Sequence, residues 1–212
     1  MSAATPSAAL RELVDGSALM MPLTVEQHRR MIEAGILQSG DPYELLDGFL
    51  VRKDRSAAGA DPTSVDPHHA WVVAKLAALT ARLKRVGYFM RTQQPVTLPP
   101  HDEPEPDGAV VRGTEDDYRE RHPGPRDVAC AIEVSDSSLR RDRTTKMRIY
   151  ADAGIARYVI INLPDAVVEV YADPIAGKGR YGESMTLQPR QTLEVPVGRG
   201  KRITVPVRNL LP

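Results

Sequence analysis

Cysteine is almost missing from this sequence, which contains a single one, Cys130, among 212 residues. One cysteine cannot form a disulfide framework within a chain, and it cannot supply a zinc site built on several thiolates. We therefore predict a reducing compartment, with the cytoplasm as the default location. Cys130 itself lies on the apolar side of a predicted strand and is interpreted as a small buried hydrophobic residue.

Long hydrophobic runs are missing as well. No stretch of the sequence approaches the roughly 18 consecutive apolar residues that indicate a transmembrane helix. The first residues lack a charged segment followed by an apolar segment, so no signal peptide and no membrane partner is predicted.

An excess of charge of either sign is absent, because 28 Lys and Arg residues balance 28 Asp and Glu residues. No global basic field therefore indicates nucleic acid, and any such binding must rest on a local patch. Aromatic residues make up only 5% of the chain, which disfavours a glycosidase with stacking aromatics beside its carboxylates. The remaining composition, 42% hydrophobic and 26% charged, is typical of a globular protein.

The strongest chemical pattern lies on a strand predicted at residues 127–135. Side chains alternate between the two faces of a strand. The face predicted to pack in the core carries Val128, Cys130, Ile132 and Val134. The opposite face carries Ala129, Ala131, Glu133 and Ser135. A carboxylate at the end of a buried strand must be paired, protonated or bound to a cation.

A second carboxylate, Asp107, precedes a short apolar strand upstream. If the two strands pair, Asp107 and Glu133 can converge on one hard cation such as Mg²⁺ or Mn²⁺. Such an ion lowers the pKa of a bound water and neutralises charge on a phosphate, as phosphodiester hydrolysis requires. Glu44 is a further carboxylate that is predicted to lie on a strand rather than in a loop.

The remaining patterns predict an α/β fold in which helices flank a mixed sheet. Helices are predicted at 24–34, 68–86 and 138–153. Strands are predicted at 43–52 (a hairpin turning at Asp47-Gly48), 88–98, 108–112, 127–135, 157–162 and 167–171. The predicted organisation is a flexible tail (1–20), a main domain (21–172) with a loop at 53–67, and a C-terminal β extension of that domain (173–212).

A basic segment follows the central strand on the helix predicted at 138–153. Ser135 stands two residues after Glu133, where a lysine would suit the chemistry, and Lys146 can point back from the helix instead. Asp142, four residues before Lys146, would orient it. The cations predicted to contact a nucleic-acid backbone are Arg140, Arg141, Arg143 and Arg148.

Each of these features has a structural alternative. Asp107 follows a proline and could simply begin a strand, and Glu133 could form a buried ion pair with Lys146 without any metal. The basic helix could be a solvated face. The residues for which a structural role is more usual than ligand binding are Glu44, His68 and His69.

Several segments resemble the Uma2 family (DUF820) of restriction-endonuclease-like proteins, within the PD-(D/E)xK nuclease superfamily. These segments are residues 43–48, 69–73, 106–107, 132–135, 146–150 and 153–158, and they span about 21–172. The resemblance implies a restriction-endonuclease-like core of αβββαβ type. It also implies cleavage of DNA phosphodiester bonds with Mg²⁺ or Mn²⁺ as cofactor, and a homodimer.

The resemblance assigns roles to individual residues. Asp107 would be the aspartate of the PD motif, and Glu133 would be the acid of the (D/E)xK motif. Glu44 matches the acid of the family's N-terminal segment and would be a third metal ligand. Ser135 departs from the superfamily lysine, as it commonly does in this family, and Lys146 is the candidate replacement.

Two other functions stay open. A non-catalytic nucleic-acid-binding or assembly protein can use the same fold, because fold does not determine function. Such a protein need not order a cation between Asp107 and Glu133. A hydrolase of small phosphoesters or nucleotides would need a closed pocket rather than an open groove.

Overall fold

The computed structural model describes residues 21–38, 40–53, 66–198 and 200–212. The tail predicted at 1–20 and most of the loop predicted at 53–67 lie outside the described residues. Among the helices that are described, none is both long and apolar enough to cross a bilayer.

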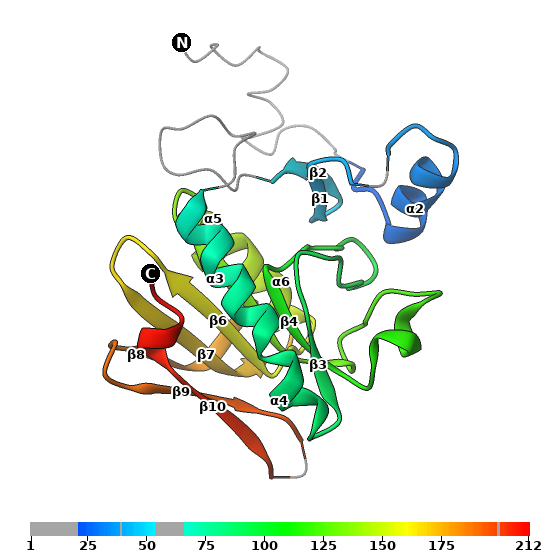
Figure 1. The fold of residues 1–212 in the computed structure, drawn as a ribbon. Helices are drawn as coiled ribbons and strands as arrows, with labels where there is room; N and C mark the ends of the chain where they lie inside the picture. The colour runs from blue at the N-terminus through cyan, green and yellow to red at the C-terminus, as the bar shows by residue number, and fades with distance from the viewer. Residues whose placement is uncertain (1–20, 39, 54–65, 199) are drawn as a thin grey trace.

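A six-stranded mixed sheet forms the centre of the fold, with the strand order β3-β4-β5-β6-β7-β8 (Figure 1). Its strands are β3 (Tyr88–Arg91), β4 (Gly108–Arg112), β5 (Val128–Ser135), β6 (Arg157–Asn162), β7 (Val167–Ile175) and β8 (Arg180–Leu187). Only β5 and β6 are parallel, and the other neighbours are antiparallel. The predicted α/β class and mixed sheet are confirmed.

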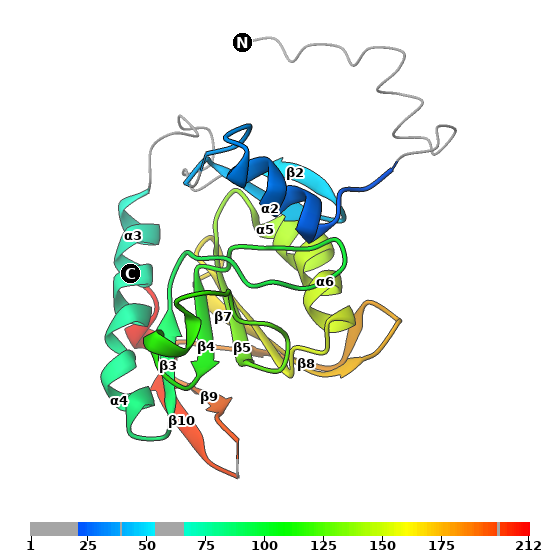
Figure 2. The ribbon, with the colours of Figure 1, turned by 90° about the vertical axis from the view of Figure 1, so that its right-hand side faces the viewer.

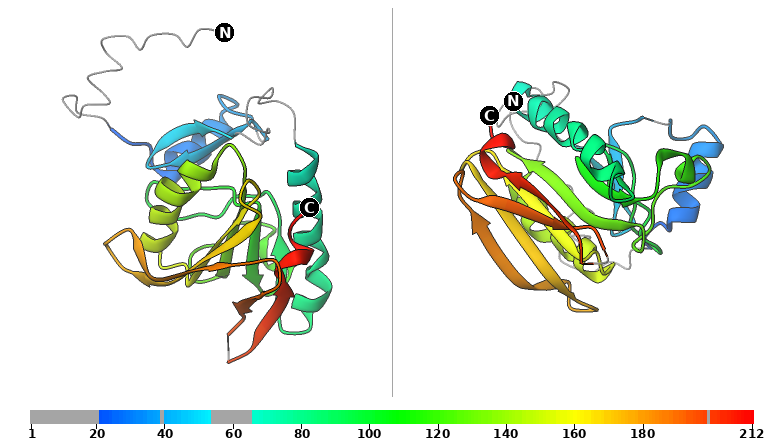
Figure 3. Two further views of the ribbon diagram at one scale, coloured as in Figure 1. Left: turned by 90° about the vertical axis from the view of Figure 1, so that its left-hand side faces the viewer. Right: turned by 60° about the horizontal axis from the view of Figure 1, so that its bottom comes forward.

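Helices cover both faces of this sheet, as Figures 2 and 3 show. On one face lie α3 (Pro67–Ala78) and α4 (Thr80–Lys84), whose buried residues join one hydrophobic cluster with Cys130 and Ile132. On the other face lie α5 (Leu139–Arg141), a π-helical turn (η2, Asp142–Lys146) and α6 (Met147–Asp152). These last three segments make the crossover between the parallel strands β5 and β6, which such a pair requires.

The predicted alternation along β5 is wrong at Val128. Val110 pairs with Cys130, but Val111 pairs with Val128, so one extra residue of β5 opposes β4 at this point. Such a bulge reverses the facing of the residues beyond it. Val128 therefore packs in the same cluster as Ala131, on the face opposite to Cys130.

The N-terminal helix and hairpin form as predicted. Helix α2 (Val25–Glu33) begins with a capping box, in which Gln27 N–H donates to Thr24 Oγ1 at 3.1 Å. Strands β1 (Tyr43–Leu46) and β2 (Phe49–Arg52) meet at Asp47 and Gly48. Both turn residues have positive φ, 53° and 75°, which is the geometry of a type I′ hairpin turn.

The C-terminal segment forms a hairpin of β9 (Thr192–Pro196) and β10 (Arg202–Pro206), followed by a 3₁₀ turn, η3 (Val207–Asn209). Its apolar residues are buried in the same cluster as α3 and α4. They therefore cover a face of the chain's own sheet (Figure 3).

Candidate active site

Three carboxylates from separate elements gather beside the start of β4. Asp107 directly precedes Gly108, which pairs with Ile132, so the antiparallel register brings Asp107 beside Glu133. Glu44 enters from β1. All three side chains are buried and line one small cavity of about 20 Å³.

Asp107 is held by three donors. The Nε2–H of His69 donates to its Oδ1 at 3.0 Å, and the backbone N–H of Val134 donates to its Oδ2 at 2.9 Å. Gln93 Nε2 adds a longer contact of 3.4 Å to Oδ1. Burial opposes ionisation of Asp107, but the hydrogen bond and charge of His69, with the Val134 amide, outweigh it and lower its pKa. Asp107 is therefore an ionised carboxylate.

His69 belongs to this site through its contact with Asp107, although the sequence favoured a structural role for it. Its backbone N–H does donate to the helix-capping Asp66, at 3.1 Å, while its ring is buried against Asp107. The pattern that could have revealed it is helical spacing. His69, Val72 and Leu76 follow the i, i+3, i+7 rule, which places the ring on the buried side of α3.

Lys146 lies between two of the carboxylates. Its Nζ is 3.1 Å from Glu133 Oε1 and 3.0 Å from Glu44 Oε2, and the residue is only 4% exposed. Burial alone would favour the neutral amine, but Glu133 and then Glu44 outweigh it and raise the pKa of Lys146. Lys146 is therefore a buried cation, and Tyr150 OH donates to the same Oε1 of Glu133 at 2.9 Å.

The hydroxyl of Ser135 binds Asp142 and does not supply the positive charge that a lysine at that position would supply. Ser135 Oγ donates to Asp142 Oδ2 at 2.7 Å, and Ser138 Oγ donates to the same oxygen at 2.5 Å. Asp142 is thus fixed by two hydroxyls, and its charge adds to those that raise the pKa of Lys146. The cation beside Glu133 comes from the helix and not from the strand.

Two residues that the sequence did not indicate complete the cluster. Lys53 Nζ binds Glu105 Oε2 at 2.6 Å, and the Glu105 N–H donates to Glu44 Oε2 at 3.1 Å. The other oxygen of Glu44, Oε1, is buried and has no hydrogen-bond partner. A buried carboxylate oxygen without a partner is costly, so this atom indicates a missing ligand.

The donor chemistry of the cluster fits a hard divalent cation. Five carboxylates line the cavity, against three Lys and Arg side chains and the ring of His69. Its volume suits about one water-sized particle. In the described part of the chain no group of three or more His, Cys, Asp or Glu residues is arranged to hold a metal. The space between Glu133 and Glu44 is instead occupied by the amine of Lys146.

Comparisons with known proteins identify the family of this chain. The family model for Uma2, described as "Putative restriction endonuclease", matches residues 25–206. The chain belongs to the Uma2 family. A comparison with curated proteins finds no match.

A solved structure also resembles this Uma2 protein. It is described as "a putative nuclease belonging to DUF820 from Anabaena variabilis ATCC 29413", with a TM-score of 0.63 and 13% sequence identity. The similarity covers 89% of this chain and 97% of that one. At this identity the likeness concerns the fold, which is a nuclease-type α/β fold. The Uma2 match runs to residue 206 and therefore includes the β9–β10 hairpin.

The four arginines that were predicted to bind nucleic acid fall into two pairs. Arg140 and Arg141 line an open cavity of about 410 Å³, and Arg141 also lines the carboxylate cavity. Arg143 instead donates to Glu169, with NH2–Oε1 at 2.5 Å and Nε–Oε2 at 3.0 Å. Arg148 donates to Asp47. The second pair of arginines therefore already has carboxylate partners within this Uma2 chain.

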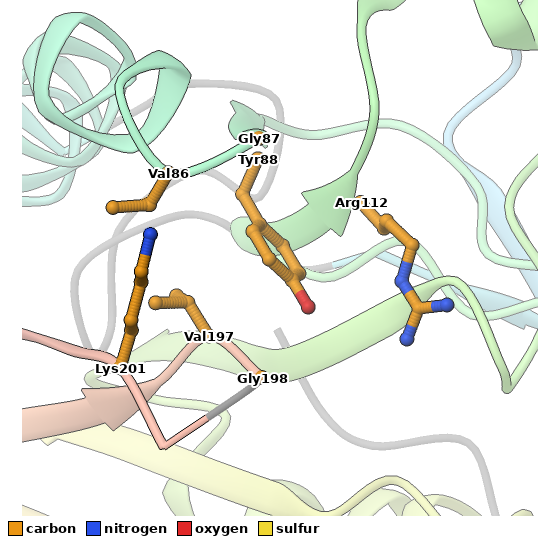
Figure 4. Close-up of a pocket in the computed structure, with 7 residues that line it drawn as sticks. All are labelled: Val86, Gly87, Tyr88, Arg112, Val197, Gly198 and Lys201. Atoms are coloured by element: carbon orange, nitrogen blue, oxygen red, sulfur yellow. The ribbon is translucent and has the colours of Figure 1, made fainter.

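Cavity size does not identify the active site of this Uma2 protein. A cavity of about 400 Å³ lies between the start of β3 and the β9–β10 hairpin (Figure 4). Its lining residues are Val86, Gly87, Tyr88, Arg112, Val197, Gly198 and Lys201. None of them is a carboxylate, so this cavity lacks the oxygen ligands of the smaller one.

Proposed function

We propose that this Uma2 protein is a Mg²⁺- or Mn²⁺-dependent endonuclease that hydrolyses DNA phosphodiester bonds. The observation that carries this proposal is the convergence of Asp107, Glu133 and Glu44 on one buried, negatively charged cavity beside Arg141. Metal-assisted phosphodiester hydrolysis needs this donor type next to a cationic surface.

Asp107 and Glu133 would hold the metal ion, with Glu44 as the third ligand through its unpartnered Oε1. When bound, such an ion supplies a water of lowered pKa and neutralises charge on the phosphate. His69 keeps Asp107 ionised and oriented through its 3.0 Å hydrogen bond. Tyr150 orients Glu133 in the same way from α6.

Lys146 would act as a fixed positive charge. Its raised pKa keeps it protonated, so it cannot accept a proton from the attacking water in this arrangement. A preorganised cation beside the developing charge stabilises the transition state by several kcal/mol, of order 3. We therefore assign Lys146 to the scissile phosphate.

Arg140 and Arg141 would guide the DNA backbone toward the carboxylates, since Arg141 lines both cavities. Contacts to phosphates are independent of sequence and sensitive to salt. Arg143 and Arg148 would join them only by sharing the carboxylates that they already bind.

One observation favours a non-catalytic nucleic-acid-binding or assembly role as the second candidate. Lys146 already supplies a cation between Glu133 and Glu44, so the carboxylates have a partner without metal. In that role the same surface would bind nucleic acid and cleave nothing. A small-phosphoester hydrolase fits less well, because the cavity beside the carboxylates is open rather than closed.

The test is nicking of supercoiled plasmid with Mn²⁺, run beside calorimetric titration of Mn²⁺. The wild type is expected to nick DNA, and Glu133→Gln is expected to lose both nicking and most of the metal affinity. Glu194→Gln, which changes an exposed glutamate on β9, is the matched control and should behave as the wild type. A wild type that cleaves no DNA or RNA with any divalent metal would establish the binding role instead.

A further inference from the structure

A larger cavity adjoins the carboxylate cluster and has no part in the chemistry proposed above. It has a volume of about 470 Å³ and lies between α2, the start of β1 and the segment that follows β3. It shares Lys53 and Glu105 with the carboxylate cavity, so the two cavities are neighbours. The lining residues that carry the inference are Tyr43, Arg91, Gln93, Gln94 and His122.

Arg91 is a half-buried cation to which no carboxylate of the described residues is bound. Among the described residues it forms no ion pair, and its buried Nε has no hydrogen-bond partner. Burial lowers the pKa of Arg91. The nearby charges of Tyr118 and Glu105 act in the opposite direction, without a hydrogen bond to the guanidinium. A desolvated guanidinium of this kind is stabilised by an anion, and its planar donors match the oxygens of a phosphate.

His122 is the hydrogen-bond partner of Arg91. The Arg91 NH2 group lies 2.8 Å from His122 Nδ1, and a guanidinium has no acceptor atom. His122 Nδ1 must therefore accept, which makes the ring neutral with its proton on Nε2. Burial lowers the pKa of His122, in agreement with a neutral ring. The guanidinium is thus oriented by a neutral side chain and keeps its full charge for a ligand.

Gln93 connects this cavity to the catalytic cluster. Its φ is 50°, in the left-handed region that costs energy for a residue with a Cβ atom. In this conformation its N–H donates to Pro106 O at 3.2 Å, and its side-chain Nε2 approaches Asp107 Oδ1 at 3.4 Å. Gln93 therefore lines the cavity and also contacts Asp107, the proposed metal ligand, through its side-chain amide.

The carboxylates of the lining already have partners, since Glu103 is bound to His28, Glu105 to Lys53, and Asp41 accepts from the Gln38 N–H. Two amides and one exposed ring of the lining suit a nucleobase. Amides such as those of Gln93 and Gln94 present both donors and acceptors, as hydrogen bonding to a base edge requires. Tyr43 is 41% exposed, and an exposed ring can stack on a base. A base inside a duplex cannot present its edge and its face at the same time, so the base must be unpaired.

We propose that this cavity is a subsite for one unpaired nucleotide next to the scissile phosphate. Arg91 binds its phosphate, Tyr43 stacks on its base, and Gln93, Gln94 and His122 bind the base edge. The inference rests on the proposed nuclease function, because it names the strand conformation that the carboxylate cluster would act on.

The experiment measures binding of a fluorescent single-stranded oligonucleotide of about 12 nucleotides by anisotropy, with EDTA present so that no cleavage occurs. Arg91→Ala and Tyr43→Ala are each expected to weaken binding about tenfold, while Tyr43→Phe retains it because the ring is kept. Arg190→Ala is the matched arginine control, since Arg190 is exposed and lines neither of the two cavities, and it should bind as the wild type.

Gln94→Ala keeps the inference testable if Arg91→Ala fails to fold, because Gln94 is exposed. It should change the preference among dA, dC and dT homopolymers. An unlabelled duplex with a central mismatch shows the source of the nucleotide, since competition with the labelled single strand that Tyr43→Ala weakens means that the base is flipped from the duplex. No competition by the duplex, with single strands still bound, means that the substrate is already single-stranded.

The subsite is overturned if Arg91→Ala and Tyr43→Ala bind the oligonucleotide as tightly as the wild type does. It is also overturned if the wild type binds no oligonucleotide. The two proposals fail in different ways. Loss of single-strand binding in the variants without any cleavage by the wild type would remove only the nuclease function. Nicking by the wild type with unchanged binding in the variants would remove only the subsite.

Discussion

At the scale of single residues, Lys146 decides how the site is stabilised. Its Nζ lies within 3.1 Å of oxygens from both Glu133 and Glu44, and all three side chains are buried. Removing one partner from a buried ion pair costs about 3 kcal/mol or more, because the remaining charge has no solvent. The same residue is the candidate for a catalytic cation, so stability and activity must be separated by experiment.

Lys146→Ala is expected to lower the free energy of unfolding by about 3 kcal/mol, since it leaves Glu133 and Glu44 without their cation. It should also abolish Mn²⁺-dependent nicking, measured on plasmid DNA at a temperature where the variant stays folded. Added Mn²⁺ should restore most of the lost stability, because it replaces the missing charge, but not the activity. Nicking at the wild-type rate would show that Lys146 is not catalytic.

Glu133 should make metal binding depend on pH. Burial raises its pKa well above the ordinary 4.5, and nearby Asp142, Asp107 and Glu44 add to this against Lys146. In the pH range between about 4.5 and this raised pKa, the folded protein holds a proton that the unfolded chain has released, and Lys146 keeps its ion pair with Glu44. Above that range Lys146 pairs with both carboxylates. Without metal, this contribution to stability is full below about 4.5 and is lost as the pH rises through the raised pKa. A cation competes with that proton, so Mn²⁺ should raise Tm more at about pH 8 than at about pH 5.

Scanning calorimetry with and without Mn²⁺ checks this dependence. Glu133→Gln cannot ionise and should remove most of the difference between the two pH values, whereas Glu194→Gln on β9 should leave it unchanged. An equal Mn²⁺ shift for the wild type at both pH values would contradict the assignment of the proton to Glu133.

At the scale of elements, the π-helical turn between α5 and α6 positions the cluster. Met147 N–H donates to Asp142 O, five residues back, and this wider turn adds one residue to the helix. Asp142 and Lys146 both stay buried across it. Asp142 thereby reaches Ser135 on β5 while Lys146 reaches Glu133 on the same strand.

Deleting Thr144, an exposed residue of this turn, should convert it to a regular α-helical turn. The helix before the deletion would rotate by about 100° relative to α6, so Asp142 would lose its bond to Ser135 on β5. We expect a fall of about 2 kcal/mol in the free energy of unfolding and loss of nicking. Thr144→Ala removes only a hydroxyl bonded to Arg140 O and should stay near the wild type.

At the scale of the whole molecule, the chain leaves an open sheet edge at β8. This strand has eight residues, most of them exposed, and it has one neighbour in the sheet, β7. The apolar residues of the β9–β10 hairpin are buried within the chain, so they do not face a partner. An open edge of this length can pair with a second copy.

We expect a homodimer through β8, since cleavage of both strands of a duplex is most simply done by two active sites. Static light scattering at micromolar concentration checks the mass. Met185, which is 49% exposed on β8, offers the variant Met185→Arg, which places a like charge from each copy at the interface and should give a monomer. Thr186→Ser is the mild control, and a wild-type monomer would contradict the prediction.

Local patterns determined most of the elements and the class of fold. The capping box at Thr24 and the Asp47-Gly48 turn depend on neighbours in sequence, and the structure has both where they were predicted. The helix predicted at 68–86 is divided into α3 and α4, and the strand predicted at 88–98 ends at Arg91. The bulge at Val110 and Val111 could not be read from the sequence, because it depends on the register between two strands.

The sequence also indicated Asp107, Glu133, Glu44 and Lys146, and the structure brings their side chains into one cavity. Their roles as ligands and catalytic groups stay predictions. What they contact was decided only by tertiary structure. His69 is a partner of Asp107 because the side of α3 that carries its ring faces the sheet.

Charge compensation was likewise decided by distances that link separate elements. Lys53 with Glu105, and Lys146 with two carboxylates, are pairs between segments that lie far apart along the chain. The sequence therefore determined which groups this protein carries. Only the tertiary structure decided which of them are buried together, because desolvation and Coulomb interactions depend on proximity in space and not on order along the chain.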